Sequence, residues 1–409
     1  NFYDGRQPEN VCAVTGTSGK SSAVDFCRQM WGLVGKPALS AGTIGIIVEN
    51  VYSEKRIIHC GDSGYTTPVS DEMYKFLGYF KDKGVEYGAL EMSSHGLDQH
   101  RLANIRIKAA GFTNLGTDHM DFYGGYKGYL DSKAKLFRES VDADGTAVLN
   151  ADIPEYEYLR GVCLKRGLRV WSYGRKGAEF KILSQSVHID GQSAEVELFG
   201  KRRGLDLKIL GEFQLGNMLC ALGMFAAVTP EWEAVLPKLG QLRNALGRLE
   251  YMGKTRNGSA IYIDFSYKGD ALEHTLKTLR SMAKGKIVLV FSTCGDVYET
   301  RRREELGRAA QEFSDIAILT DDSPRFEDAQ KIRDEVLAFC PKAVEVKTGR
   351  KDAIRLAFET AGIGDVVLVA GKGHEDYFTV GDVDVPYTDQ QAVRELLDEE
   401  RPCASSQNK

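Results

Sequence analysis

The chain has 409 residues, enough for two or three domains, and its 43% hydrophobic and 27% charged residues are typical of a globular protein. The net charge of −5 argues against a nucleic-acid scaffold, and no apolar run reaches the roughly 18 to 20 residues that span a bilayer. The eight cysteines include no C-x-x-C pair, and the start of the chain lacks signal-peptide character, so we predict a cytoplasmic protein with reduced thiols. We expect neither a membrane nor a nucleic-acid partner.

The first half of the chain alternates short apolar runs with helical patterns. Residues 11–15 predict a buried strand, and residues 21–33 predict a helix that ends at Gly35. Residues 84–91 and 108–113 predict further core strands. Because strands and helices alternate, we expect a parallel sheet covered by helices on both faces.

The pattern changes at residues 180–210, where polar and apolar side chains alternate. This segment predicts an antiparallel hairpin inserted before a helix that starts near Phe213. A second α/β series begins near Gly247. Its expected strands are residues 260–264, 286–291, 316–320 and 365–370, and its expected helices include residues 302–313 and 328–339.

We place the domain boundary at about residue 244, where the sequence NALGR supplies a break. The predicted fold class is α/β: a central P-loop-type parallel sheet domain followed by a smaller Rossmann-like α/β domain. The expected domains are residues 1–243, which bind ATP, and residues 244–400, which bind an amino acid. Residues 401–409 are expected to form a tail.

Residues 15–22 (TGTSGKSS) lie between the first predicted strand and the first predicted helix. This placement gives a nest of backbone N–H groups and a positive helix N-terminus that both favour an anion. Lys20 is expected to reach the outer phosphates of a nucleotide, and the Ser21 hydroxyl to bind Mg²⁺. A regular Walker A motif has a further glycine where this chain has Val14, so the alternative is a Gly/Ser turn that merely caps the helix. We favour a phosphate loop because strand, loop, Lys-Ser pair and helix occur together.

Two further motifs are residues 91–101 (EMSSHGLDQHR) and 112–121 (FTNLGTDHMD). Together with the phosphate loop they resemble the Mur ligases, and among these the tripeptide synthetases that add diaminopimelate. Other motifs match the same family in the same order: YTTP at 65–68, SKAKLF at 132–137, GRLE at 247–250, DSPR at 322–325 and AGKGHED at 370–376.

The resemblance runs from about residue 2 to about residue 380. Mur ligases usually have a first domain, which holds much of the uridine nucleotide and precedes the phosphate loop. Since the loop starts at residue 15, we expect this chain to lack that domain.

The resemblance implies an ATP-dependent amide ligase that acts in peptidoglycan precursor synthesis. The ATP γ-phosphate would pass to a substrate carboxylate, and the incoming amine would attack the acyl phosphate. Cations are needed because both reacting groups are anions. The implied cofactors are ATP and Mg²⁺, and the implied partners are UDP-N-acetylmuramoyl-L-alanyl-D-glutamate and an amino acid. We expect a monomer.

The resemblance also implies the catalytic residues Lys20, Glu91, His119 and Lys133. Ser21 and Glu91 would bind one Mg²⁺, while His119 and a carbamylated Lys133 would surround a second. A plain ammonium would repel Mg²⁺, whereas a carbamate supplies anionic oxygens. The alternatives are an exposed helix lysine for Lys133 and a structural histidine for His119.

The other implied site residues bind the three substrates. Arg248 would reach across the cleft between the two domains as a mobile cation, and for Ser93 the alternative is a structural turn. The ATP-binding positions are Gly16, Thr17, Ser18, Gly19, Lys20, Ser21, Ser22, Asn217, Arg248 and Asp264; the acceptor-binding positions are Thr66, Thr67, Ser93, Gln99 and Arg101; the amino-acid-binding positions are Asp322, Ser323, Arg325, Gly371 and Glu375.

Arg325 indicates meso-diaminopimelate as the added amino acid, because a guanidinium can bind its distal carboxylate through two hydrogen bonds. Lysine-adding relatives lack this arginine. Several positions depart from the family. Among them, Tyr267 replaces a histidine, and Val297 replaces an arginine that also contacts diaminopimelate. One of the arginines at 301–303 is the alternative contact. We favour diaminopimelate.

Two other functions are compatible with the same motifs. One is a paralogue that joins an amino acid to a different acyl acceptor, and the other is a catalytically impaired nucleotide-binding scaffold. Polyglutamate-adding ligases share the phosphate loop but are not expected to carry SSHG at 93–96. The presence of all four implied catalytic residues favours an active ligase.

Overall fold

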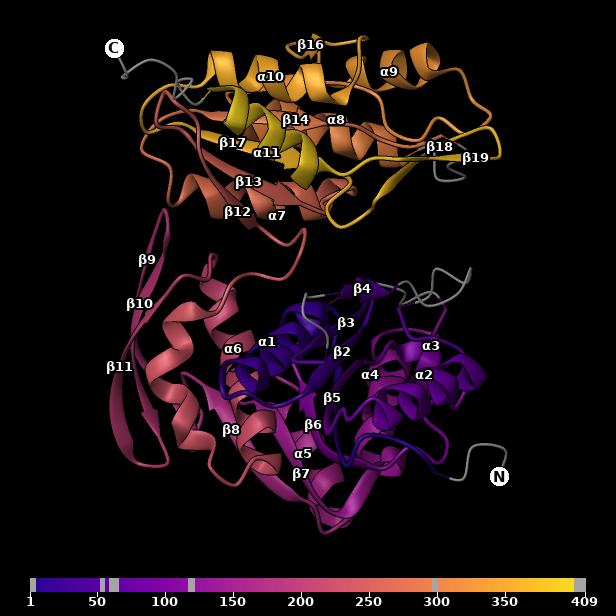
Figure 1. Cartoon of the computed structure of the whole chain (residues 1–409), viewed down its shortest axis with the longest axis vertical. Helices are drawn as coiled ribbons and strands as arrows, with labels where there is room; N and C mark the ends of the chain where they lie inside the picture. Colours follow the sequence, from indigo (N-terminus) through magenta and orange to yellow (C-terminus); the bar gives the residue numbers. More distant parts are fainter. Residues whose placement is uncertain (1–4, 52–55, 59–65, 117–121, 296–300, 401–409) are drawn as a thin grey trace, which may run out of the picture. The chain divides into compact units, whose positions relative to one another are not determined.

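The computed structural model describes residues 5–51, 56–58, 66–116, 122–295 and 301–400. The chain forms two compact units. Unit 1 comprises Asn1–Val187 and Gly191–Ala245, and unit 2 comprises His188–Asp190 and Leu246–Lys409. In the described residues, unit 1 contains an eleven-stranded sheet and unit 2 a six-stranded sheet (Figure 1).

The sheet of unit 1 has the strand order β11-β10-β9-β8-β7-β6-β1-β5-β2-β3-β4. Its centre, from β9 to β2, is parallel, whereas β3 and β4 pair antiparallel at one edge and β10 with β11 at the other. The strands are β1 (Asn10–Thr15), β2 (Ala38–Gly42), β3 (Gly45–Glu49), β4 (Arg56–Ile58), β5 (Tyr87–Glu91), β6 (Ile107–Phe112), β7 (Val141–Asn150), β8 (Arg169–Gly174), β9 (Phe180–His188), β10 (Gly191–Leu198) and β11 (Lys201–Leu207).

Helices cover both faces of this sheet, as the alternation of strands and helices predicts. Successive side chains of a strand point to opposite faces, so Val11 and Ala13 enter one core while Cys12 and Val14 enter the other. The helices are α1 (Lys20–Leu33), α2 (Ser70–Asp82), α3 (Ser94–Asp98), α4 (Tyr126–Lys135), the π-helix η1 (Leu136–Ser140), α5 (Tyr156–Lys165), α6 (Glu212–Val228) and the 3₁₀-helix η2 (Trp232–Gln241). Helices α1 and α6 supply one core and α2 and α5 the other.

The segment at 180–210 contains β9, β10 and β11 rather than a separate hairpin. The predicted antiparallel pairing is present between β10 and β11. However, β9 pairs in parallel with β8 at Tyr173 and Gly174, so the segment extends the central sheet. The predicted antiparallel hairpin before the helix is therefore confirmed for β10 and β11, while the parallel pairing of β9 was not predicted. The following helix begins at Glu212, next to the expected Phe213.

Unit 2 contains a sheet of order β12-β13-β17-β14-β15-β16, parallel except for β12. The four predicted strands and two predicted helices are confirmed, and no end differs from its predicted position by more than two residues. The elements are β12 (Glu250–Lys254), β13 (Ala260–Asp264), α7 (Gly269–Arg280), β14 (Ile287–Phe291), α8 (Arg301–Phe313), β15 (Ile316–Leu319), α9 (Ala329–Leu337), β16 (Val344–Glu345), α10 (Arg350–Thr360), β17 (Val366–Ala370), β18 (Tyr377–Val380), β19 (Val383–Pro386) and α11 (Asp389–Glu400).

In both units the carboxyl ends of parallel strands carry the polar residues singled out from the sequence. Loops at this edge are where open α/β sheets bind ligands. In unit 1 the phosphate loop follows β1 and Glu91 ends β5. In unit 2 Asp322 follows β15 and Gly371 follows β17. None of the helices within the described ranges is long and apolar enough to cross a bilayer.

Candidate active site

The loop that joins β1 to α1 is fixed by the residues that follow β6. Asn114 accepts hydrogen bonds from two backbone N–H groups of the loop. Thr17 N donates to the Asn114 main-chain oxygen (2.9 Å), and Ser18 N donates to Asn114 Oδ1 (3.0 Å). The Thr113 hydroxyl donates to the Ser18 carbonyl at 2.6 Å. The shape of the loop therefore depends on contacts with a neighbouring strand as well as on its own sequence.

Two glycines of this loop occupy positions that admit no side chain. A Cβ on Gly16 would lie 1.9 Å from Thr113 Oγ1, and one on Gly19 would lie 2.3 Å from Asn217 Oδ1. Gly19 also has a φ of 85° and caps α1 without a side-chain hydrogen bond to the first turn. The loop thus leads directly into a helix N-terminus, which is a site that favours anions.

Lys20, the first residue of α1, folds back over the loop. Its Nζ donates to the carbonyls of Gly16 (3.2 Å) and Thr17 (2.8 Å) and lies 3.9 Å from Glu91 Oε1. Its side chain is 15% exposed. The ammonium is therefore held beside the loop backbone, as expected for a phosphate-binding lysine.

Glu91, the last residue of β5, gathers hydrogen bonds at one buried carboxylate. Its Oε2 accepts from the Ser21 hydroxyl and from Thr43 N, both at 3.0 Å, and its Oε1 accepts from the Thr43 hydroxyl at 3.2 Å. Mg²⁺ binds oxygen ligands of this kind, so these side chains fit the expected ion. The described residues include no group of three or more His, Cys, Asp and Glu residues arranged to hold a metal, and His119 lies outside them.

Lys133 is 2% exposed, so the alternative of an exposed helix lysine is wrong. Its Nζ donates to the Gly16 carbonyl at 2.8 Å and lies 4.4 Å from the centre of the Tyr129 ring. Helix α4 therefore directs this side chain onto the phosphate loop. The Gly16 carbonyl accepts from both Lys20 and Lys133.

The residues expected to bind the acceptor form a hydrogen-bond network that includes the main chain of Glu91. The Thr67 hydroxyl donates to the Glu91 carbonyl at 3.0 Å and accepts from Ser93 N at 2.9 Å. The Ser93 hydroxyl accepts from Gly96 N at 3.0 Å, which caps helix α3. Ser93 thus has the structural role weighed as its alternative, while it lies within the same network as Thr67.

The same network includes two more of these candidates. Arg101 donates to the Thr67 carbonyl, and its Nε donates to Gln99 Oε1 at 3.0 Å. The Thr66 hydroxyl accepts from Thr43 at 3.3 Å. All five acceptor-binding candidates are therefore linked to Glu91 through hydrogen bonds, either directly or by way of neighbouring side chains.

Two residues of this region were missed in the sequence. Thr43 follows β2 at the same edge of the sheet, and that position was its available signal. Gln214 of α6 donates to Ser22 Oγ at 3.1 Å and accepts from Asn217 Nδ2 at 3.0 Å. Its signal was the three-residue spacing from Asn217, which puts both side chains on one face of a helix.

In unit 2, Asp264 and Arg248 lie close to each other. Asp264 ends β13, and its carboxylate accepts from Leu249 N at 2.7 Å and from the Thr275 hydroxyl at 3.3 Å. The Arg248 guanidinium lies 4.9 Å from the centre of the Phe265 ring. Both ATP-binding candidates are therefore adjacent in this unit.

The amino-acid-binding candidates converge where β15 and β17 end. Lys372, whose side chain is fully buried, places its Nζ 3.4 Å from both Asp322 Oδ1 and Glu375 Oε2. Burial opposes ionisation of Asp322, but Lys372 and Arg350 lower its pKa below the usual 3.8. Burial raises the pKa of Glu375 above its usual value. Lys372 belongs to the motif at 370–376, but the sequence did not predict that it pairs with both of these carboxylates.

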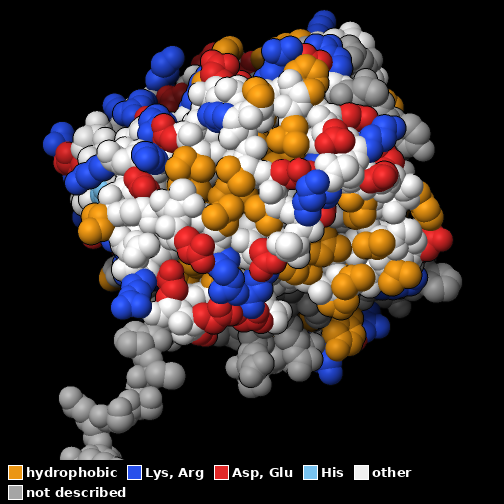
Figure 2. Space-filling view, turned by 90° about the horizontal axis from the view of Figure 1, so that it is seen from above, with side chains coloured by type: hydrophobic (Ala, Val, Ile, Leu, Met, Phe, Trp, Pro, Cys, Tyr) orange, Lys and Arg blue, Asp and Glu red, His pale blue; other side chains and the backbone are white. Residues whose placement is uncertain are grey.

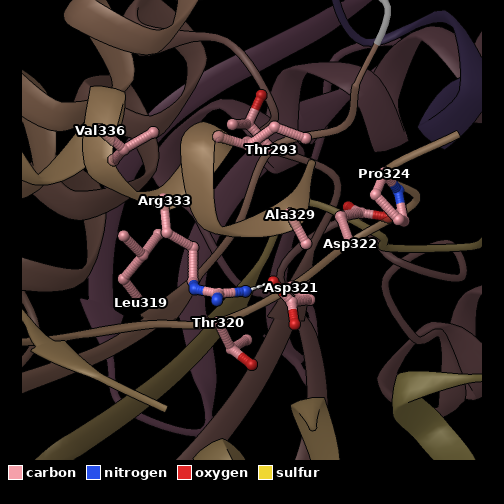
Figure 3. A pocket seen from close by; sticks show the side chains of 10 residues that line it. Thr293, Leu319, Thr320, Asp321, Asp322, Pro324, Ala329, Arg333 and Val336 are labelled. Atoms are coloured by element: carbon pink, nitrogen blue, oxygen red, sulfur yellow. Dashed lines mark hydrogen bonds and ion pairs between the residues drawn. The ribbon is translucent and has the colours of Figure 1, made fainter. Parts of the chain in front are cut away.

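A small cavity lies beside Asp322, between the end of β15 and helix α9 (Figure 3). Its volume of about 10 Å³ suits a single water molecule rather than an amino acid. The buried hydroxyls of Thr293 and Thr320 line it and have no hydrogen-bond partner among the described residues. The groups open to solvent in this region are instead Arg325, which is exposed, and Glu375, whose side chain is 40% exposed.

The arginines weighed as replacements at Val297 have different surroundings, and Val297 itself lies outside the described residues. Arg303 is bound by two glutamates, Glu327 at 2.9 Å and Glu335 at 2.5 Å. The Arg302 guanidinium lies 5.3 Å from the centre of the Tyr267 ring. Arg302 therefore contacts the other residue that departs from the family pattern.

Comparison with known proteins identifies the family. The model of the Mur ligase middle domain matches residues 14–225, and that of the Mur ligase glutamate ligase domain matches residues 247–373. The chain belongs to the Mur ligase family. The predicted family and α/β fold are confirmed, and with them the class of ATP-dependent ligases.

Individual relatives of this Mur ligase carry a more specific name. UDP-N-acetylmuramoyl-L-alanyl-D-glutamate–2,6-diaminopimelate ligase of Agrobacterium fabrum is 39% identical over 402 residues, which cover 97% of this chain and 79% of the relative. The ligase of the same name from Bradyrhizobium diazoefficiens is 40% identical over 395 residues, covering 96% of this chain and 79% of the relative.

Solved structures show the same architecture. A UDP-N-acetylmuramoyl-L-alanyl-D-glutamate–2,6-diaminopimelate ligase has a TM-score of 0.68 at 26% identity, covering 96% of this chain and 79% of that one. Folylpolyglutamate synthase of Mycobacterium tuberculosis, complexed with ADP, has a TM-score of 0.70 at 17% identity, covering 91% of this chain and 89% of that one. The latter likeness shows the fold that this Mur ligase shares with a different ligase.

Proposed function

We propose that this chain uses ATP to join meso-diaminopimelate to UDP-N-acetylmuramoyl-L-alanyl-D-glutamate through an acyl phosphate, in peptidoglycan precursor synthesis. The observation that carries the proposal is the Gly16 carbonyl, which accepts from the Nζ atoms of Lys20 (3.2 Å) and Lys133 (2.8 Å). The Glu91 carboxylate lies 3.9 Å from the first of them. The Lys20 ammonium, the N-terminus of α1 and a bound Mg²⁺ ion can bring an anionic phosphate and an anionic carboxylate together. The names of the relatives support the choice of substrates.

The geometry of unit 1 supports the following assignment of roles. The loop N–H groups, the N-terminus of α1 and Lys20 bind the phosphates of ATP. Ser21 and Glu91 hold a Mg²⁺ ion, which when bound neutralises charge on the transferred phosphoryl group. Lys133 is buried against Gly16, where a carbamate on its nitrogen would add anionic oxygens beside the loop. We keep His119 as the other member of that second metal environment.

The remaining candidates are assigned to the three substrates. Asn217, Arg248 and Asp264 contribute to ATP binding. Thr66, Thr67, Ser93, Gln99 and Arg101 hold the muramoyl peptide, supported by their shared network next to Glu91. Arg325 binds the distal carboxylate of diaminopimelate, and Asp322, Ser323, Gly371 and Glu375 shape its pocket. We further assign ATP binding to residues 1–243 and amino-acid binding to residues 244–400.

We place the reaction in the cytoplasm and expect a monomeric enzyme without nucleic-acid or membrane partners. The described cysteines are free thiols, which suits a reducing compartment. On the face shown in Figure 2, basic and acidic side chains are interspersed. A surface that binds nucleic acid would instead carry a continuous basic patch.

The test is an assay of the purified chain with ATP, Mg²⁺, the UDP-muramoyl-dipeptide and either diaminopimelate or lysine. Phosphate release and product mass are measured together. We expect product that contains diaminopimelate, and a loss of at least about a hundredfold in rate for Lys20→Met. Lys75→Met, at an exposed lysine of α2, is the control and should keep the wild-type rate. Product formed only with another acceptor would favour the paralogue, and bound ATP without turnover would favour the impaired relative.

A further inference from the structure

Arg350, the first residue of α10, has a fully buried guanidinium. Its Nε and Nη2 donate to the two carboxylate oxygens of Asp389, at 2.7 and 2.8 Å. Its Nη2 also donates to the Ala370 carbonyl at 2.8 Å, and its Nη1 to Ser292 Oγ at 2.7 Å. This one side chain therefore connects the carboxyl ends of β14 and β17 with the start of α11. None of the family motifs quoted from the sequence contains Arg350, Asp389 or Ser292.

The hydrogen bonds around Ser292 have a fixed direction. A guanidinium only donates, so Ser292 Oγ must accept from Arg350. The single hydroxyl proton of Ser292 is then available to Asp322 Oδ2, which lies 3.2 Å away. Arg350 thus acts on Asp322 through one intervening hydroxyl. Lys372 approaches the opposite oxygen, Oδ1, at 3.4 Å, so the carboxylate is held from both sides.

Asp322 in turn holds the short turn that ends at Arg325. Its side chain is 8% exposed, and its Oδ1 accepts from Ser323 N at 2.7 Å. The oxygens of Asp322 are therefore occupied by protein groups. This arrangement makes Asp322 an anchor of the turn more than a direct ligand.

Arg325 has a φ of 53°, in the left-handed region that non-glycine residues rarely adopt. Its backbone is held there by Thr379 O, which accepts from Arg325 N at 3.1 Å, and by Gly381 N, which donates to Arg325 O at 2.9 Å. A strained backbone at a binding residue persists when its surroundings fix it. The contacts with residues 379–381 fix one end of the turn, and Asp322 fixes the other.

We propose that Arg350 is a positioning residue for the incoming amino acid, acting through Ser292 and Asp322 to hold the turn that presents Arg325. The inference rests on the proposed function and extends it, because it names the residues that set the position of the specificity-determining guanidinium. A buried ion pair is weak evidence for stability, since apolar residues of similar volume often serve as well. Four directed hydrogen bonds from one guanidinium, one of them to Ala370 at the end of β17 and one to Ser292 just after β14, fit a positioning role.

Ser292→Ala is the sharpest variant, because it removes the hydroxyl between Arg350 and Asp322 and leaves the Arg350–Asp389 pair in place. Arg350→Lys keeps the charge but cannot make the four hydrogen bonds. Ser314→Ala is the control for the first, since Ser314 is a buried residue of the same unit whose hydroxyl donates to Ala310 O. Arg355→Lys is the control for the second, since Arg355 lies on the same helix α10 and is paired with Glu399 at 2.5 Å.

The measurements are the KM values for diaminopimelate, ATP and the UDP-muramoyl-dipeptide, the ratio of kcat/KM for diaminopimelate over lysine, and the thermal midpoint. For both test variants we expect the KM for diaminopimelate to rise about tenfold and the ratio to fall by a similar factor. The other two KM values should stay within twofold of the wild type, as should all values of the controls. The thermal midpoint of Ser292→Ala should match that of Ser314→Ala.

An unchanged KM for diaminopimelate in Ser292→Ala would overturn the proposal, even if Arg350→Lys fails to fold. An equal rise in all three KM values, or a loss of thermal stability alone, would also overturn it, because either result describes a purely structural residue. If the wild type accepts a different amino acid, the proposed function fails. The KM of the same variants for that amino acid would then test the positioning role of Arg350 separately.

Discussion

The hydroxyl of Ser21 donates to Glu91 Oε2 at 3.0 Å and so joins the first turn of α1 to the last residue of β5. Thr43 adds a backbone and a side-chain hydrogen bond to the same carboxylate. Three segments far apart in the chain thus place oxygen atoms together at the edge of the sheet. This arrangement leads to a prediction about the metal requirement.

Glu91→Gln should raise the Mg²⁺ concentration needed for half-maximal activity by about tenfold or more, because an amide oxygen replaces an anionic ligand of a hard cation. The measurement is the rate at saturating ATP over a Mg²⁺ titration. Glu157→Gln, at an exposed carboxylate of α5, serves as the control. A lowered rate with an unchanged Mg²⁺ titration would mean that Glu91 does not bind the ion.

Lys133→Ala should reduce the rate by about a hundredfold or more, and added short-chain carboxylates should restore part of it. The reason is that a carboxylate can occupy the space of the proposed carbamate beside Gly16. Lys135→Ala on the same helix is the matched control, since Lys135 is partly exposed and paired with Asp98 at 2.7 Å. Wild-type activity should also fall in carbonate-free buffer and recover with bicarbonate. An enzyme that stays fully active with demonstrably unmodified Lys133 contradicts the carbamate.

Much of the fold was predictable because apolar runs bounded by turn residues mark the core strands. Residues 11–15 and 260–264 are examples, and each forms a strand that lies between two other strands of its sheet. The continuation of β8 into β9 was not predictable, since it depends on a parallel pairing of two residues on each strand. Such a short pairing leaves no periodic signal in the sequence.

The site was predictable where residues of one motif act together, as in the loop at 15–22. Contacts between separate elements were not. Arg350 and Asp389 begin two different helices, and Ser292, which accepts from Arg350, follows a third element, β14. Each of these residues has an ordinary local sequence, and their relation exists only after folding.

The buried pair of Arg350 and Asp389 should be important for the stability of unit 2. Asp389→Asn leaves a buried guanidinium without its counter-ion, so we expect a loss of about 3–5 kcal/mol in the free energy of unfolding. Glu335→Gln is the comparison, because Glu335 is 43% exposed and pairs with Arg303; its loss should be at most about 1 kcal/mol. Hydrogen exchange of the β14 and β17 amides reports the difference. Equal protection in the two variants contradicts this expectation.

The pKa of Asp322 gives a prediction with a definite sign. Its pKa in the folded protein lies below the usual 3.8, because Lys372 and Arg350 outweigh the effect of burial. The stabilisation is then fully present above that usual value and is lost as the pH falls towards the folded-state pKa. The difference in unfolding free energy between wild type and Asp322→Asn should therefore be equal at pH 7 and pH 5 and shrink below about pH 4. A difference that instead grows in favour of the wild type as the pH falls from 7 to 5 would show a raised pKa.

Arg325→Ala tests the choice of amino acid directly. Alanine keeps the Cβ, so the cost of the left-handed backbone at this position stays in place and the side chain alone is removed. A hydrogen bond to a charged group contributes about 1.5 to 3 kcal/mol, or about one to two decades in affinity. We therefore expect kcat/KM for diaminopimelate to fall by about ten- to a hundredfold. The value for lysine, which has no distal carboxylate, should change by less than about threefold. Arg308→Ala, at an exposed arginine of α8, is the control. Equal losses with both amino acids, or a wild type that prefers lysine, would show that Arg325 does not select diaminopimelate.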